Sequence, residues 1–271
     1  MHQPLKNIVQ FSLKWLAKVY LWFGKPYVIV ISGTTGRFWI KEKIADVLKG
    51  KNFLVRTNKK NFNAEIGLPL SILNLPSGEG SFWGWVKVLL KGIRDVIGII
   101  NPRANPRQSE YLVLEMAIDR PENMEYLLSI VKPNLAVFTA ITMIYQENFE
   151  SLDEIAGEYK QLVKVLPWDG VLILNNDDER VKNLAEYHKG KTITYGFSEK
   201  SQFRARDVKK VADGQEFKIE IQKKEKEIIA AKIDRFGKHH IYAELVKEII
   251  KENFKEHQRE FFGKILDMEK E

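Results

Sequence analysis

The stretch YVIVISGTTGRFWIKEK, residues 27–43, decides which fold the rest of the chain must complete. Residues 28–31 are β-branched, which favours a buried parallel strand, and Gly33 and Gly36 bound the turn that follows. In a phosphate-binding loop, backbone N–H groups hold phosphate oxygens, a lysine reaches the terminal phosphates and a hydroxyl meets Mg²⁺. Here Arg37 replaces the lysine, and Phe38, which cannot ligate magnesium, replaces the hydroxyl. The loop alone fits a purely structural turn equally well.

Length and composition exclude several classes of protein. A chain of 271 residues can bury a substantial core as one large domain or one domain with additions. We expect neither a membrane span nor a secretory signal, because Lys14 and Lys18 interrupt the apolar start and no small-residue cleavage site follows. The absence of cysteine excludes disulfides and thiol catalysis and fits a cytoplasmic protein. The net charge of +7 is compatible with nucleic acid, anionic lipid or a phosphorylated ligand. Because lysines alternate with glutamates, as on ordinary solvated faces, and no nucleic-acid motif occurs, we expect no nucleic-acid partner.

The first segment, residues 1–24, has the pattern of a basic amphipathic helix over residues 5–23. Lys6, Lys14 and Lys18 gather on one arc with neighbouring amides, while Trp15 and Trp22 lie outside that arc. Such a helix can lie on an anionic membrane surface, which would make the protein peripheral at the membrane. Packing against its own domain or a protein partner is the commoner use.

From residue 27 onward, short apolar runs alternate with helical patterns. We expect strands at residues 27–32, 53–56, 111–115, 134–139 and 171–174. We expect helices at residues 38–48, 82–99, 122–131, 152–166 and 178–187. Ser151 followed by Glu154 is a capping-box pattern for the fourth helix. This alternation predicts an α/β fold, with a mainly parallel sheet covered by helices on both faces.

The alternation of strand and helix patterns ends after Gly196. Residues 203–208, 216–222 and 228–233 read as strands, separated by an Asp213-Gly214 turn and a lysine-rich turn. They predict a small antiparallel β appendage over about residues 203–234. A helix over about residues 239–254 follows, then a charged helical tail at 256–271, so we expect the main domain to span residues 25–255. The segment 101–109 is expected to be an exposed loop.

Several motifs, in order, resemble the central ATP-binding domain of the Mur ligases, most closely the type that adds D-alanyl-D-alanine. The resemblance runs from about residue 25 to about residue 250. The motifs are GTTGRFWIKE at 33–42, NFNAEIGLP at 61–69, YLVLEMAIDRPENMEYL at 111–127, SLDEIAGEYKQLVKVLPWDGVLILNNDDERV at 151–181 and GKHHIY at 237–242.

The resemblance implies a P-loop-like domain in which ATP phosphorylates a carboxylate and an amine then attacks the acyl phosphate. It assigns nucleotide binding to Gly33, Thr34, Thr35, Gly36, Arg37, Asn175 and Asp178, and Mg²⁺ binding to Glu115. Ordinary roles stay open: Glu115 as partner of a surface cation, Asn175 in a turn, and Asp177 or Asp178 as a helix cap.

Several positions depart from the family pattern. Besides Arg37 and Phe38, Tyr145 stands where a metal-binding histidine is expected. Tyr159 stands where a carbamylated lysine is expected, and the adjacent Lys160 should point elsewhere, because one residue turns a helix by about 100°. Gln161 replaces a carboxylate, and His240 replaces the asparagine beside His239. Cations normally offset the repulsion between carboxylate and triphosphate, so these changes weaken the expected chemistry.

We therefore expect a nucleotide-binding or scaffold module related to peptidoglycan precursor synthesis, with ATP as its ligand, a degenerate catalytic site and the role of Mg²⁺ in doubt. The alternative is an active acid–amino-acid ligase that works with a partner chain, since the family's flanking domains have no counterpart in the first 25 residues or after residue 250. A third interpretation is a structural protein that keeps only the sheet.

Overall fold

The computed structural model describes residues 3–59, 62, 64–79, 81–100, 110–143, 147–223 and 225–268. Within them, nine strands form one sheet in the order β2-β3-β1-β4-β5-β6-β7-β8-β9. Strands β2 to β7 pair in parallel, and β7, β8 and β9 pair antiparallel. The predicted α/β fold with a mainly parallel sheet and antiparallel C-terminal strands is confirmed.

Strand β1 lies inside the parallel part, and its alternate side chains serve both faces of the sheet. Val28 and Val30 point into the core on one face, whereas Ile29 and Ile31 point into the core on the other. The parallel strands are β1 (Tyr27–Ser32), β2 (Leu54–Thr57), β3 (Glu110–Glu115), β4 (Leu135–Phe138), β5 (Val171–Asn175) and β6 (Lys191–Gly196). Burial on both faces explains why the central strands are nearly continuous apolar runs.

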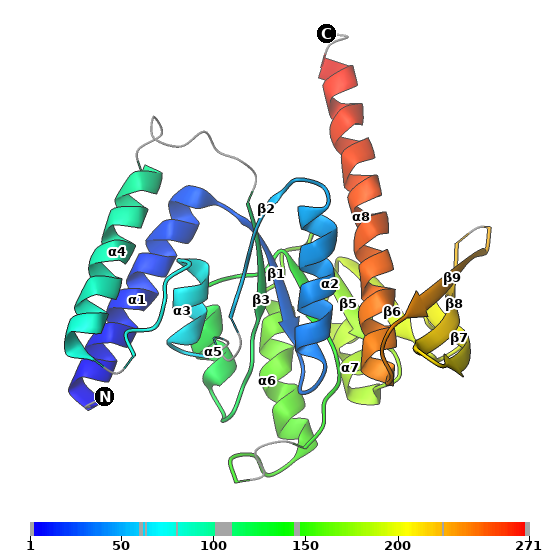
Figure 1. Ribbon diagram of the computed structural model, residues 1–271, viewed down its shortest axis with the longest axis horizontal. Helices are drawn as coiled ribbons and strands as arrows, with labels where there is room; N and C mark the ends of the chain where they lie inside the picture. Colours follow the sequence, from blue (N-terminus) through cyan, green and yellow to red (C-terminus); the bar gives the residue numbers. More distant parts are fainter. Residues whose placement is uncertain are drawn as a thin grey trace.

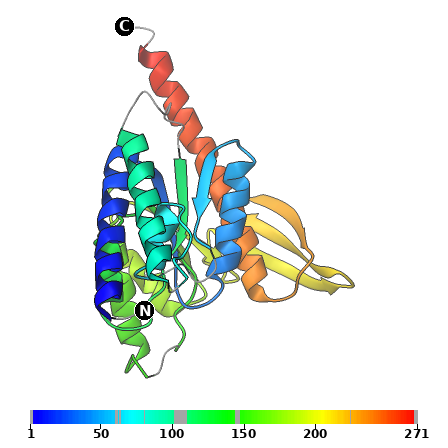
Figure 2. The same cartoon turned by 60° about the vertical axis from the view of Figure 1, so that its left-hand side comes forward.

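Helices cover both faces of the sheet (Figures 1 and 2). One face carries α1 (Gln3–Gly24), α3 (Gly67–Ile72), α4 (Phe82–Ile100), α5 (Asn123–Leu128), α6 (Leu152–Lys164), α7 (Glu179–Asn183) and the short 3-10 helix η1 (Leu184–Tyr187). The other face carries α2 (Arg37–Lys49) and α8 (Lys238–Met268), which lie side by side. None of the described helices combines the length and apolar character needed to cross a bilayer.

The antiparallel strands extend the same sheet at one edge. They are β7 (Phe203–Val211), β8 (Gly214–Ile221) and β9 (Glu227–Ile233), and Tyr195 of β6 pairs with Phe203 of β7. The expected turn at Asp213-Gly214 joins β7 to β8, with Gly214 at a φ of 148°. Asp213 is also an ion-pair partner of Lys232 on the neighbouring strand β9, at 3.0 Å.

The elements differ from expectation in three places. Strand β6 and helix α3 were not among the predicted elements. The helix expected over residues 239–254 and the separate tail helix are one continuous helix, α8. The expected loop at 101–109 lies outside the described residues. The division into segments 1–24, 25–255 and 256–271 stays a prediction.

Candidate functional site

The loop between β1 and α2, residues 33–36, has a backbone that two glycines make possible. Gly33 has a φ of 112° and Gly36 a φ of 79°, in the left-handed region that favours glycine. A Cβ on Gly33 would lie only 2.2 Å from the hydroxyl oxygen of Thr139, so the close approach also excludes a side chain. Gly36 is the N-cap of α2 and provides no side chain to cap it. The loop therefore leaves the start of α2 open to an external acceptor.

Thr34 fastens this loop to the segment that follows β4. Its backbone N–H donates to the carbonyl of Ala140 at 2.8 Å. Its hydroxyl lies 2.7 Å from the hydroxyl of Thr142 and accepts the Thr142 backbone N–H at 3.0 Å. Thr34 is buried, whereas Thr35 is exposed. The Thr34 hydroxyl is thus engaged in holding the loop, and Thr35 is the threonine that faces solvent.

Glu115 lies at the end of β3, next to the loop, with 12% of its side chain exposed. Lys41, on the second turn of α2, places its Nζ 3.0 Å from Glu115 Oε1. The Nε of Arg37 lies 3.7 Å from Glu115 Oε2. Arg37 also donates from a terminal nitrogen to the carbonyl of Gly33. The carboxylate assigned to Mg²⁺ therefore has a cation beside each of its two oxygens.

Asn58 holds Glu115 in place through the backbone. Its side-chain oxygen accepts the Glu115 N–H at 2.9 Å, and its amide nitrogen donates to the Glu115 and Phe62 carbonyls at 3.1 Å each. Lys41 donates to the Asn58 carbonyl at 2.9 Å. Sequence reasoning missed Asn58. The signal that could have found it is its position directly after β2, which pairs in parallel with β3.

Aromatic and cationic side chains surround the start of α2. The Phe38 ring, 43% exposed, lies edge-on to Trp39 at 5.0 Å between centroids. Trp39 packs against His240 at 4.4 Å between centroids, and the guanidinium of Arg235 lies 4.7 Å from the Trp39 ring centroid. Burial lowers the pKa of His240, and the charges of His239 and Arg235 lower it further. The GKHHIY segment therefore adjoins the phosphate-loop motif in space.

The LNNDD turn, which follows β5, contacts the same segment after β4. Asp178 caps α7 by accepting the Val181 N–H at 3.0 Å, and its second oxygen accepts the Ile141 N–H at 2.8 Å. Asn175 accepts the Asp177 N–H at 3.0 Å within the turn. Asn175 therefore stabilises a turn and Asp178 caps a helix, which are the ordinary roles considered for these two residues. Because Thr34 and Asp178 bind neighbouring residues of one segment, the loop and the turn lie at the same end of the sheet.

Asp177, which was considered only as a possible cap, joins three elements instead. Its carboxylate accepts the backbone N–H groups of Phe197 and Ser198 and the hydroxyl of Tyr242, at 2.8 to 3.0 Å. Tyr242 lies on α8, so this carboxylate connects the turn after β5 to the C-terminal helix. Burial raises the pKa of Tyr242 above its ordinary range, as does the nearby Asp177 charge.

The altered positions on α6 contact β4, η1 and α6 itself. Tyr159 is fully buried, with its ring centroid 5.8 Å from that of Phe138. Lys160 places its Nζ 3.8 Å from the centroid of the Tyr187 ring, so it does not replace a lysine at 159. Gln161 donates to Glu158, whose carboxylate caps the start of α5. Tyr145 lies outside the described residues.

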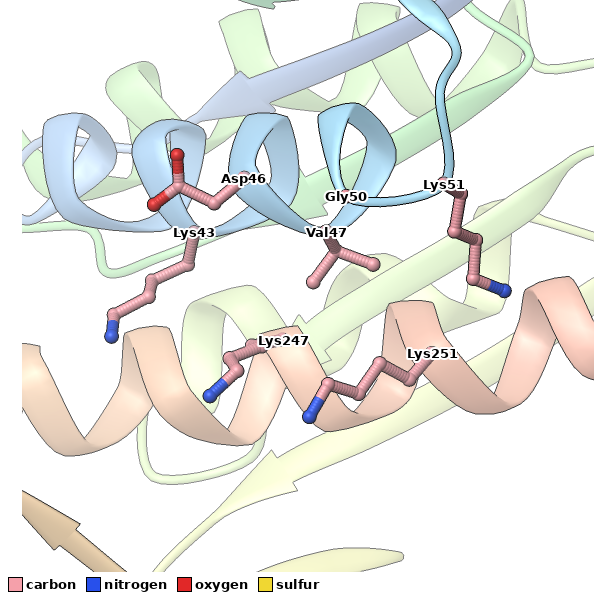
Figure 3. A pocket seen from close by; sticks show the side chains of 7 residues that line it. All are labelled: Lys43, Asp46, Val47, Gly50, Lys51, Lys247 and Lys251. Carbon is pink, nitrogen blue, oxygen red and sulfur yellow. The ribbon is translucent and has the colours of Figure 1, made fainter.

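Two further features concern the described residues: they contain no cluster of metal-binding side chains, and a cavity lies beside α2. Among the residues with described side chains, no three His, Asp or Glu residues cluster as a metal site. Glu115 is an ion-pair partner of Lys41 and Arg37 in this structure. A cavity of about 560 Å³ lies between α2 and α8 (Figure 3), at the end of α2 away from the loop. It is lined by Lys43, Asp46, Val47, Gly50, Lys51, Lys247 and Lys251.

Lys43, Lys247 and Lys251, which line this cavity, have acidic partners. Lys43 lies 3.0 Å from Glu244, which Lys247 also contacts, and Lys251 lies 2.7 Å from Glu248. Burial opposes ionisation of Glu244, but Lys247 and Lys43 outweigh it and lower the pKa of that carboxyl. The cavity is therefore part of the packing between α2 and α8.

Comparison with known proteins gives consistent results. The family model described as the Mur ligase middle domain matches residues 97–246, a range that includes Glu115, Asn175 and Asp178 but not the loop. The UDP-N-acetylmuramoyl-tripeptide–D-alanyl-D-alanine ligase of Bacillus subtilis (strain 168) is 28% identical over 208 residues, 77% of this chain and 38% of its own length. The corresponding ligase of Buchnera aphidicola is 26% identical, over 78% of this chain and 40% of its own length. The chain thus spans about two fifths of these relatives.

Solved structures show the same fold. The MurF ligase of Thermotoga maritima, in complex with ADP, superposes with a TM-score of 0.69 and 19% identity, over 94% of this chain and 50% of its own. A structure of MurF from Acinetobacter baumannii gives a TM-score of 0.67 and 15% identity, over 88% of this chain and 45% of its own.

Proposed function

The chain belongs to the Mur ligase middle-domain family, and from that premise we propose that it is a nucleotide-binding module of peptidoglycan precursor synthesis without ligase activity of its own. The proposal is that the loop and the start of α2 hold the phosphates of ATP or ADP. The ion-handling groups that amide formation needs are, in this proposal, degenerate.

One observation carries the proposal: Lys41 and Arg37 both pair with Glu115. A carboxylate serves a Mg²⁺ ion by offering a free, negatively charged oxygen. Recruiting Glu115 would require separating it from a lysine whose side chain is 2% exposed. That separation would remove the nearest carboxylate from a buried ammonium and leave it with the Asn58 carbonyl and with Glu42 at 3.6 Å, which costs free energy. With Phe38 at the position of the loop hydroxyl, a second protein oxygen is also missing there.

Nucleotide binding is supported by the geometry at the start of α2. The first N–H groups of a helix have no acceptor within the helix, and the helix dipole favours an anion at this end. Gly33 and Gly36 allow the left-handed backbone of the loop, and Arg37 supplies a positive charge. Arg37 at present donates to the Gly33 carbonyl, so phosphate binding would rotate its guanidinium outward. A guanidinium can then bind two phosphate oxygens at once.

Calorimetry with ATP and with ADP, each in Mg²⁺ and in EDTA, tests this proposal when combined with measured phosphate release. We expect similar affinities in both buffers and no turnover. Arg37→Ala should weaken binding about tenfold or more, because one charge-assisted contact to phosphate is lost. The matched control, Arg235→Ala, removes a nearby arginine that lies over Trp39 and should leave the affinity within about twofold. Rapid Mg²⁺-dependent hydrolysis, or no binding at millimolar nucleotide, would contradict the proposal.

The retained carboxylate supports a second candidate function. Glu115 keeps an acidic group at the end of β3, and the chain spans only 38% of the length of the Bacillus subtilis ligase. An active ligase completed by a partner chain would release ADP only with that partner and an amine acceptor. Glu115→Ala would abolish this activity if Glu115 holds Mg²⁺, and an unchanged rate would exclude that role.

A further inference from the structure

Helices α1 and α4 form an outer layer over one face of the sheet (Figures 1 and 2). Their inner sides are buried: Val9, Leu13 and Ala17 on α1 pack into the same core as Val88 and Val96 on α4. Gly92 allows the two helices to approach closely, because a Cβ there would lie 3.2 Å from the Leu16 side chain. Packing into the core therefore explains the apolar residues on only one side of each helix.

The outer sides of the same helices are also apolar. We call this surface the α1–α4 face, defined by Ile8, Phe11, Trp15, Trp22, Trp83, Leu90, Ile93, Ile97 and Ile100. On each helix these residues follow one another at three, four or seven positions, which places them in one stripe along the helix. Trp22 is 75% exposed and Trp83 is 70% exposed. An apolar surface spread over two helices is uncommon on a monomer and marks an interaction site.

The charges beside the α1–α4 face are almost all positive. The sequence of α1 contains three lysines and no acidic residue, and that of α4 contains Lys87, Lys91 and Arg94 with Asp95 as its one acidic residue. Asp95 lies 3.6 Å from Arg94. Lys18 lies 5.1 Å from the centroid of the Trp15 ring, so a cation borders the apolar stripe directly. A second copy of this face would oppose like charges, whereas an anionic surface would be complementary.

We propose that the α1–α4 face docks on the surface of an anionic lipid bilayer. Tryptophan and phenylalanine would enter the boundary between headgroups and acyl chains, where aromatic side chains are favoured. Lys18, Lys87, Lys91 and Arg94 would meet lipid phosphates. Both helices would lie in the plane of the surface, because α4 carries four charged residues along its length. The loop and the start of α2 belong to other elements, so membrane docking does not depend on nucleotide binding.

Co-sedimentation of the whole chain with vesicles tests the proposal. We expect binding to vesicles that contain phosphatidylglycerol, weak binding to pure phosphatidylcholine, and a loss of binding as salt rises. The double variant Trp22→Ala/Trp83→Ala should lower the partition coefficient about tenfold or more. The variant Lys87→Glu/Lys91→Glu should lower it on anionic vesicles alone. The matched control is Trp168→Ala, which removes a tryptophan 84% exposed on another part of the surface.

Circular dichroism and unfolding midpoints should be unchanged in all these variants, since the substituted side chains are exposed. Three results would overturn the proposal. The first is no binding to either vesicle type. The second is an equal loss of binding in Trp168→Ala. The third is self-association in gel filtration that Trp22→Ala/Trp83→Ala abolishes while vesicle binding persists, which would assign the α1–α4 face to a second copy of the chain.

Discussion

The ammonium group of Lys41 lies 3.0 Å from the Glu115 carboxylate, and the Lys41 side chain is buried. This ion pair joins α2 to the end of β3, a strand that lies far from α2 in the sequence. Because Asn58 also bonds to both the N–H and the C=O of Glu115, this residue is held from two other segments of the chain. It is a structural element as well as a candidate ligand.

We predict that Lys41→Met destabilises the protein by about 3 kcal/mol, because removing one partner leaves a poorly solvated charge. Urea denaturation at neutral pH measures the change. Lys49→Met is the matched control, since Lys49 is an exposed residue in the last turn of the same helix and should cost less than about 0.5 kcal/mol. Equal costs for the two variants would show that the buried ion pair contributes nothing specific.

Restoring the usual loop chemistry should restore a response to magnesium. In Arg37→Lys/Phe38→Thr, a hydroxyl becomes available at the start of α2 and the bulkier guanidinium is gone. We expect ATP to bind this variant more tightly in Mg²⁺ than in EDTA, by about threefold or more, whereas the parent chain shows no difference. Calorimetry of the variant and the parent chain with ATP, in Mg²⁺ and in EDTA, measures this difference in affinity. A variant that remains indifferent to Mg²⁺ would place the defect at Glu115 rather than in the loop.

Loss of the Asp178 carboxylate should destabilise the end of the sheet that carries the loop. Asp178→Ala removes both the cap of α7 and the bond to the Ile141 N–H, and we expect a cost of about 1–2 kcal/mol. Asp153→Ala is the control, because Asp153 is exposed and pairs only with Arg180 among its described salt-bridge partners. Thermal unfolding should distinguish them. Similar midpoints for both variants would argue against a tethering role for Asp178.

Stability should depend on the protonation of His240. Burial first, and then the charges of His239 and Arg235, lower the pKa of this imidazole in the folded protein. The unfolded chain therefore binds a proton more readily, so this contribution to stability is complete above about pH 6.5 and declines as the pH falls toward the lowered folded pKa. His240→Gln should flatten this part of the stability profile, measured by denaturation between about pH 5 and 8. Parallel profiles would contradict the assignment.

Local sequence signals predicted most of the fold. The β-branched run of β1, the Ser151 cap of α6 and the Asp213-Gly214 turn each depend on neighbouring residues, and each occurs where expected. Strand β6 was missed because its side chains are only partly buried and its run, KTITYG, lacks the apolar continuity of β1. Helix α3 is only six residues long, too short for a clear period.

The site was less predictable because its contacts are distant in the sequence. That Asp178 could cap a helix follows from residue type, and the cap is present. That Glu115 is paired with Lys41 and Arg37 depends on the parallel register of β1 and β3, which no local pattern encodes. The hydrogen bonds of Asp177 were likewise not predicted, because its three partners lie 20 or more residues away in the sequence.

Strand β1 has a consequence for how the polypeptide emerges during synthesis. Its two neighbours in the sheet are β3 and β4, and β4 ends at Phe138. More than one hundred residues beyond the VIVI run must therefore be synthesised before both edges of β1 can form hydrogen bonds with neighbouring strands. Pairing between such distant segments is slow, and an apolar strand left unpaired favours aggregation. Ribosome-bound chains that end before residue 135 should accordingly need more chaperone protection than chains extended past β5.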